Sequence, residues 1–128
     1  MDIADIKRKA QAAREATFAD GALSFVVRLP TRHEVEVSAM RARLHDGEPD
    51  PAQLSVVRRR LLESAVVQWA GVTCEHLAPG AGDEPAELSA EAVAVLLDSN
   101  PELAEKLDAH FVGRMAARNS QQAEAEKN

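Results

Sequence analysis

Residues 18–34 read Phe-Ala-Asp-Gly-Ala-Leu-Ser-Phe-Val-Val-Arg-Leu-Pro-Thr-Arg-His-Glu, and this stretch decides the fold class. Its Asp20-Gly21 pair is a strong signal of a two-residue β-hairpin turn. Between Leu23 and Leu29 every second residue is apolar, which is the period of a half-buried strand. A proline then ends the strand, and Thr31 with Glu34 forms the capping-box pattern of a helix start. The stretch therefore predicts a hairpin followed directly by a helix.

The helix that begins at the end of this stretch should be followed by a second one. The first should run from about Arg32 to His45, and residues 46–49, Asp-Gly-Glu-Pro, should break it. Asp50-Pro51 then repeats the pattern of an N-cap followed by proline at the first helical position. The second helix should extend from Pro51 to about Ala70, with Gly71 closing it in a left-handed conformation. Its apolar stripe contains Leu54, Val57, Leu61, Ala65 and Trp69, and Leu62 and Val66 widen it.

The rest of the chain alternates between loops and helices. Residues 72–88 are rich in Pro and Gly and predict a loop that is either mobile or functional. Ser89 should cap a short helix through about Asp98, and Asn100-Pro101 should start another. The apolar residues of this last helix are Leu103, Leu107, Phe111 and Met115.

We therefore expect an α+β fold that is mainly helical, with an N-terminal β-hairpin followed by about four helices. Residues 1–14 should be an N-terminal helix or arm with a narrow apolar face. Residues 15–118 should form a single globular domain. Residues 119–128 are polar and predict a disordered tail.

Composition restricts the class of protein. The chain has 128 residues, of which 45% are hydrophobic and 28% charged, so one ordinary domain can bury a core. Only 3% are aromatic, which predicts an aliphatic core. Apolar runs are too short for a membrane-spanning helix, and we expect no secretory signal at the N-terminus. The single cysteine, Cys74, excludes an internal disulfide and fits a reducing cytoplasm.

The charge is unevenly distributed. The net charge is −6, which does not favour binding to nucleic acid. Residues 1–60 hold 11 Lys and Arg against 9 Asp and Glu, whereas residues 61–128 hold 4 against 12. Either both halves are simply solvated, or the positive half of one copy meets the negative half of the next. Head-to-tail association of that kind would weaken with salt.

Few residues carry recognisable chemistry. Cys74 and His76 lie two residues apart, but two ligands do not make a structural zinc site. Nucleophilic catalysis by Cys74 would need a lowered thiol pKa, and its acidic surroundings favour the protonated thiol. The known phosphate-binding and hydrolase motifs are missing from the sequence. We expect no catalytic residue, no metal and no cofactor, and an enzyme using Cys74 and His76 remains an alternative.

Candidate partner-binding residues are more numerous. Arg58, Arg59 and Arg60 fan over about 200° of a helix, so they are either solvated or face an acidic protein partner. A lone tryptophan at the end of an amphipathic helix is either a core anchor or a binding hot spot. The hairpin edge needs covering by a helix or by a strand from another copy. The predicted partner-binding residues are Trp69, Phe25, Val27, Arg58 and Arg59.

Four short segments also carry a resemblance: Phe25–Glu34, Val66–Val72, Leu88–Val93 and Asn100–Leu103. Together they resemble the tail assembly chaperones of long-tailed bacteriophages and prophages. The similarity covers residues 15–112. Its more specific part is the Arg-x-Pro-Thr-Arg-x-Glu start of the first helix, followed by Trp-Ala-Gly-Val.

The resemblance implies a mostly helical protein with a small sheet and no enzymatic activity. Such chaperones bind the long, helical, aggregation-prone tape measure protein and help tail tube subunits to assemble around it. They act in the host bacterial cytoplasm and are absent from the mature virion. Many are made in two forms through a translational frameshift. We accordingly expect tape measure protein, and tail tube subunits, as partners, together with self-association into a homo-oligomer.

The segment Thr73–Pro85 is longer and richer in Gly and Pro than the tight turn that the resemblance implies there. The alternative function is a small regulatory or adaptor domain that binds its partner through the Arg58–Arg60 helix face.

Overall fold

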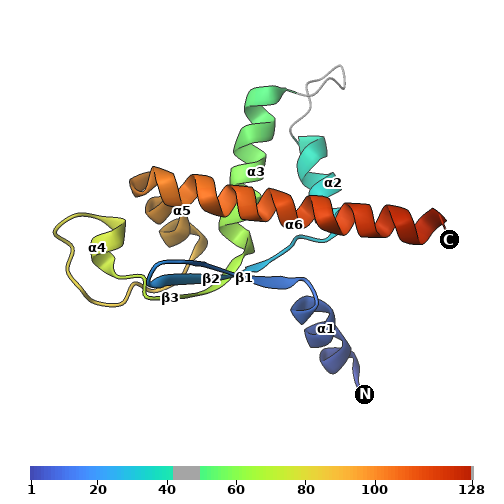
Figure 1. Ribbon diagram of the computed structural model, residues 1–128, viewed down its shortest axis with the longest axis horizontal. Coiled ribbons are helices and arrows are strands. Elements are labelled where there is room, and N and C mark those ends of the chain that lie inside the picture. The colour runs from blue at the N-terminus through green and yellow to red at the C-terminus, as the bar shows by residue number, and fades with distance from the viewer. Residues whose placement is uncertain (42–49, 128) are drawn as a thin grey trace.

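A computed structural model describes residues 1–41 and 50–127 of the chain. Their fold is α+β and mainly helical, as the sequence predicts, with one three-stranded antiparallel sheet of order β1-β2-β3 (Figure 1). The elements are α1 (Ile3–Ala12), β1 (Glu15–Asp20), β2 (Leu23–Arg28), α2 (Arg32–Arg41), α3 (Pro51–Ala65), β3 (Val66–Ala70), α4 (Cys74–Leu77), α5 (Ala90–Ser99) and α6 (Pro101–Lys127). In this part of the chain, no helix combines the length and apolar character that crossing a membrane requires.

The predicted hairpin is present, but it is the second element of the chain and not the first, because the helix α1 precedes it. Its turn also lies one residue later than the Asp20-Gly21 pair that predicts it. Asp20 still pairs with Leu23, so the two turn residues are Gly21 and Ala22. Gly21 has a φ of 61°, and a glycine at the first turn position is typical of a type II′ hairpin.

The prediction of one helix from Pro51 to Ala70 is wrong in its last turn. The helix α3 ends at Ala65, and β3 pairs antiparallel with β2 so that Trp69 lies opposite Phe25. Val66, Val67 and Trp69 are residue types that suit a pleated surface. Their pairing also gives β2 a second neighbour, whose backbone hydrogen bonds satisfy an otherwise open edge. Gly71 does adopt the predicted positive φ, at 80°, but it ends a strand.

The core lies between the sheet and the helices above it. Figure 1 shows α5 and α6 on one side of the sheet, with the end of α3 running down into it. The fully buried side chains come from β2, α3, α5 and α6 and are mainly aliphatic, as the composition predicts. The largest are Phe25, Phe111, Leu62, Leu96, Leu97, Leu107, Val27 and Val93.

The predicted helix starts are confirmed by their side-chain caps. The Glu34 amide donates to Thr31 Oγ1 at 3.1 Å, and the Ala52 amide donates to a carboxylate oxygen of Asp50 at 3.1 Å. Ser89 caps α5 by accepting from the Ala92 amide at 3.0 Å.

One helix ends later than the sequence predicts, and the predicted end of another cannot be compared with the described residues. The helix α6 does not stop before Asn119 but continues through Lys127, because Gln, Ala, Glu and Lys there favour a helix. The helix α2 is described to Arg41, and the predicted break at residues 46–49 lies outside the described residues.

Candidate protein-binding groove

Two helices form an arm that stands away from the rest of the described chain. Figure 1 shows α2 and α3 side by side, rising beyond α6 on the side opposite the sheet. No residue of α2 is buried, and in α3 only Leu62 and Ala65 are buried, both in its last turn. Among the described residues, the two helices of the arm therefore form no packed apolar interior of their own.

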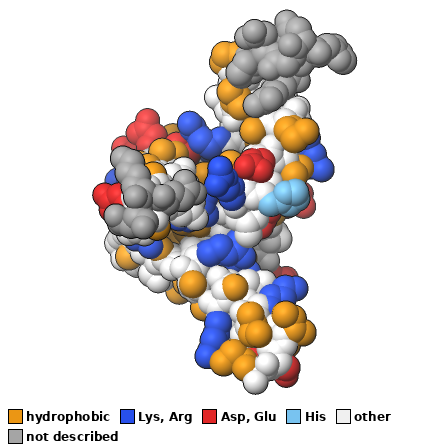
Figure 2. Space-filling model, turned by 90° about the vertical axis from the view of Figure 1, so that its right-hand side faces the viewer, with side chains coloured by type: hydrophobic (Ala, Val, Ile, Leu, Met, Phe, Trp, Pro, Cys, Tyr) orange, Lys and Arg blue, Asp and Glu red, His pale blue; other side chains and the backbone are white. Residues whose placement is uncertain are grey.

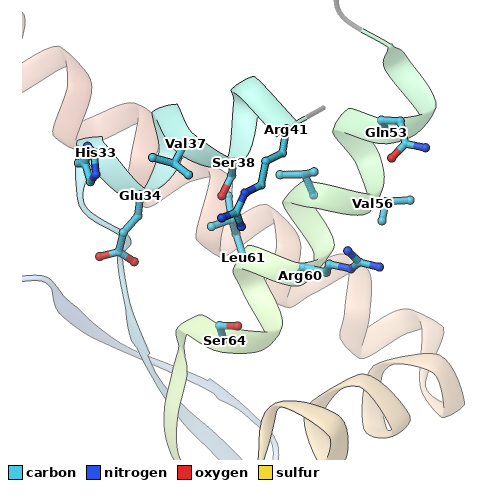
Figure 3. A pocket seen from close by; sticks show the side chains of 11 residues that line it. His33, Glu34, Val37, Ser38, Arg41, Gln53, Val56, Arg60, Leu61 and Ser64 are labelled. Atoms are coloured by element: carbon cyan, nitrogen blue, oxygen red, sulfur yellow. The ribbon is translucent and has the colours of Figure 1, made fainter. Parts of the chain in front are cut away.

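A groove of about 530 Å³ runs between the two helices (Figure 3). Its apolar side chains are Val37 from α2 and Val56, Val57 and Leu61 from α3. Val56 is 43% exposed, and the other three are only partly buried. A second hollow of about 240 Å³ also reaches Val57 and Leu61. The apolar residues between α2 and α3 thus remain open to a partner.

The groove is lined by three charged residues, two arginines and one glutamate, together with His33, Ser38, Gln53 and Ser64. Arg41 extends from the end of α2 into the space between the helices, and Arg60 extends from α3 (Figure 3). Glu34 also lines the groove, but its carboxylate accepts a hydrogen bond from Thr31 Oγ1 and lies 3.7 Å from Arg14 Nη1. The groove combines apolar side chains with two guanidinium groups, so it suits an apolar partner that carries negative charge.

The predicted partner-binding arginines do not line the larger groove, although Arg58 lines the smaller hollow beside it. Arg58 Nη2 lies 3.5 Å from Asp108 Oδ2 of α6, and Arg59 Nη2 lies 3.2 Å from Asp98 Oδ1 of α5. Both arginines therefore connect α3 to helices of the same chain. Within the described residues Arg60 makes no ion pair, so the three adjacent arginines serve different sides of the helix.

The other predicted partner-binding residues belong to the sheet. Phe25 and Val27 are each 1% exposed, on the central strand, and offer no surface to a partner in this conformation. Trp69 is half-buried against the core, and its indole Nε1 donates to the Ala86 carbonyl at 3.0 Å. The tryptophan therefore holds the loop before α5 onto the sheet.

The loop around Cys74 is organised by its own polar contacts. The Thr73 amide donates to His76 Nδ1 at 3.0 Å, and the Cys74 amide donates to the Glu84 carbonyl at 2.9 Å. His76 thus serves as a helix cap. Among the described residues no group of three or more His, Cys, Asp or Glu side chains is arranged to hold a metal ion.

Glu75 is the central residue of this loop. Its carboxylate accepts from the Gly80 amide at 2.9 Å and from the Gly82 amide at 3.1 Å. These two hydrogen bonds hold the pKa of Glu75 below its ordinary value of 4.5. Because the folded pKa is lowered, the ionised carboxylate stabilises the loop above pH 4.5, and this stabilisation is lost as the pH falls through the folded value.

Replacing Glu75 by alanine is expected to open this loop without unfolding the chain. The Gly80 and Gly82 amides should exchange several-fold faster with deuterium at pH 6, and in the unchanged protein their protection should fall as the pH drops below 4.5. Hydrogen exchange followed by mass spectrometry measures both effects. Glu87→Ala is the control, since that exposed carboxylate lies in the same loop. Equal exchange in the two variants would show that Glu75 does not hold the loop.

The groove was not predicted from the sequence. The sequence places Val37 on the apolar face of the helix that starts at Arg32, but it marks neither Arg41 nor Val56 as a binding residue, and it marks Arg60 only as part of Arg58–Arg60. One signal was available, because Leu54, Val56 and Val57 place apolar residues on more than one side of the helix that Pro51 begins.

Comparisons of the chain with protein-family models, with curated proteins and with solved structures find no match. The feature of the described residues that points to a function is therefore the groove between α2 and α3. It has apolar and basic side chains, which is typical of a surface that binds another protein.

Proposed function

We propose that this chain is a non-enzymatic chaperone of phage tail assembly, which binds the tape measure protein and aids polymerisation of the tail tube. In this proposal it acts in the host bacterial cytoplasm and is not retained in the mature virion. Two features support the proposal: the four sequence segments that resemble tail assembly chaperones, and the mainly helical fold with a small sheet.

The observation that carries the proposal is the open groove between α2 and α3. Exposed apolar surface costs about 25 cal/mol per Å², so a partner that covers Val37, Val56 and Leu61 gains free energy. An amphipathic helix lying in such a groove presents side chains at positions i, i+3 or i+4, and i+7. A helical, aggregation-prone client has such stripes in abundance.

Self-association is the second part of the proposal. The helix α1 has no buried residue, and Ile3 and Ile6 are 78% and 49% exposed. Residues 1–60 carry a small excess of basic residues and residues 61–128 a large excess of acidic ones, and together with the exposed helix this charge distribution favours contact between copies. The adaptor alternative, which uses the Arg58–Arg60 face, is less favoured, because two of its three arginines pair with carboxylates of the same chain.

Co-expression tests the proposed function. The chain is expected to keep a tape measure protein from the same phage or prophage region soluble, and the two should elute together in size-exclusion chromatography. A coiled-coil protein of similar length serves as the control client and should not be retained. If the tape measure protein stays insoluble and no complex elutes, the proposed function is wrong.

A further inference from the structure

We propose that the groove between α2 and α3 selects an amphipathic helix whose apolar stripe is flanked by carboxylates. This inference rests on the proposed function, because it names the kind of client segment that the chaperone would bind.

The apolar part of the groove has the dimensions of a helix face. The helix α2 has 10 residues and is therefore about 15 Å long, which corresponds to nearly three helical turns. Val37 lies on one side of the groove, and Val56, Val57 and Leu61 lie on the other. A third helix laid between them would place three successive apolar side chains against this floor. It would also supply the packed interior that the arm lacks.

The charge around the groove determines which helix fits. Arg41 and Arg60 both line it, and the one carboxylate among its lining residues, that of Glu34, already contacts Thr31 and Arg14. Figure 2 shows hydrophobic and basic side chains close together over this face, with an acidic side chain and a histidine among those of the arm. A client with Glu or Asp beside its apolar stripe would pair with the two guanidinium groups. A client with Lys or Arg in those places would be repelled.

The same criterion excludes the most obvious occupant from this chain. The helix α1 has an apolar stripe of Ile3, Ile6 and Ala10, with Lys7 and Lys9 beside it. In the groove, these lysines would lie near Arg41 and Arg60, so like charges would oppose docking of α1 from a second copy. The occupant that fits the charge of the groove is an acidic helix, and the proposed function makes it a helix of the client.

The test uses two synthetic helices of 21 residues that share one leucine stripe and carry a fluorescent label. One has Glu on both flanks of the stripe and the other has Lys. The Glu-flanked helix is expected to bind about tenfold tighter by fluorescence anisotropy, because two attractive pairs replace two repulsive ones. A Glu-flanked version with a central proline should bind far more weakly, since it cannot form the helix.

Substitutions then locate the binding. Val56→Asp should abolish binding of the Glu-flanked helix, whereas Val95→Asp should not, although Val56 and Val95 are 43% and 41% exposed. The double change Arg41→Glu and Arg60→Glu should reverse the preference, so that the Lys-flanked helix binds more tightly. Lys7→Glu, a charge reversal outside the groove, should leave the preference unchanged. Circular dichroism checks that each variant is folded.

The outcomes separate this inference from the proposed function. If the tape measure protein is kept soluble equally well by the Val56→Asp variant, the chaperone function stands and the groove is not its binding site. If the Glu-flanked helix binds as described but the tape measure protein is not retained, the groove stands and the client is wrong. Equal affinity for the two helices, or no reversal in the double variant, would overturn the inference.

Discussion

Replacing Gly71 by alanine is expected to lower the free energy of unfolding by about 2–5 kcal/mol. Two costs add at this position. Gly71 has a φ of 80°, a backbone conformation that costs an ordinary residue about 1–2 kcal/mol. In addition, a Cβ would lie 2.3 Å from the Ala22 carbonyl oxygen, so the hairpin turn would have to move away. Urea denaturation followed by circular dichroism measures the loss.

Gly80→Ala separates the two costs. Gly80 has a similar φ of 86°, but a Cβ there would meet no other atom within 4 Å. We expect this variant to lose only about 1–2 kcal/mol, from backbone strain alone. Equal losses at the two positions would mean that the close approach between Gly71 and the hairpin turn is not present in solution.

Gly71 also illustrates what a sequence can and cannot predict. Its positive φ was expected, since glycine is the usual residue where the chain must adopt a left-handed conformation. Its contact with Ala22 was not, because that contact depends on how β2 and β3 pair. The caps at Thr31, Asp50 and Ser89 were likewise predicted, since each depends on residues within a few positions.

The strand β3 was missed for a related reason. Trp69 follows Ala65 at an interval of four residues, so it fits the apolar stripe of the helix that begins at Pro51. The competing signal, β-branched and aromatic residues over Val66–Trp69, is decisive only when a partner strand is available. That partner is Phe25 and its neighbours, some forty residues earlier in the chain.

The candidate site was even less accessible to prediction. The sequence does not reveal that α6 brings Asp108 beside Arg58, or that α5 brings Asp98 beside Arg59. The groove itself depends on how far apart α2 and α3 lie, which the composition of neither helix determines. Hydrophobic periodicity identifies the apolar face of a helix, but it does not show whether other parts of the fold cover that face.

The two halves of α3 provide the sharpest test of the arm. Leu62 is fully buried among core residues from β2, α5 and α6, whereas Leu54, two turns earlier on the same helix, is 38% exposed. Leu62→Ala is expected to lower the free energy of unfolding by about 2–5 kcal/mol, since it removes contacts and leaves a cavity. Leu54→Ala should cost about 0.5 kcal/mol or less, because little around Leu54 is packed.

Thermal or urea unfolding measures the loss in free energy of unfolding for each variant. Both variants change leucine to alanine on the same helix, so the two losses can be compared directly. A large difference would mean that only the last turns of α3 belong to the core, which leaves the first turns available to a client. Similar losses would mean that α3 is packed along its whole length in solution. The groove between α2 and α3 would then be closed, and both the proposed client site and its preference for an acidic helix would be wrong.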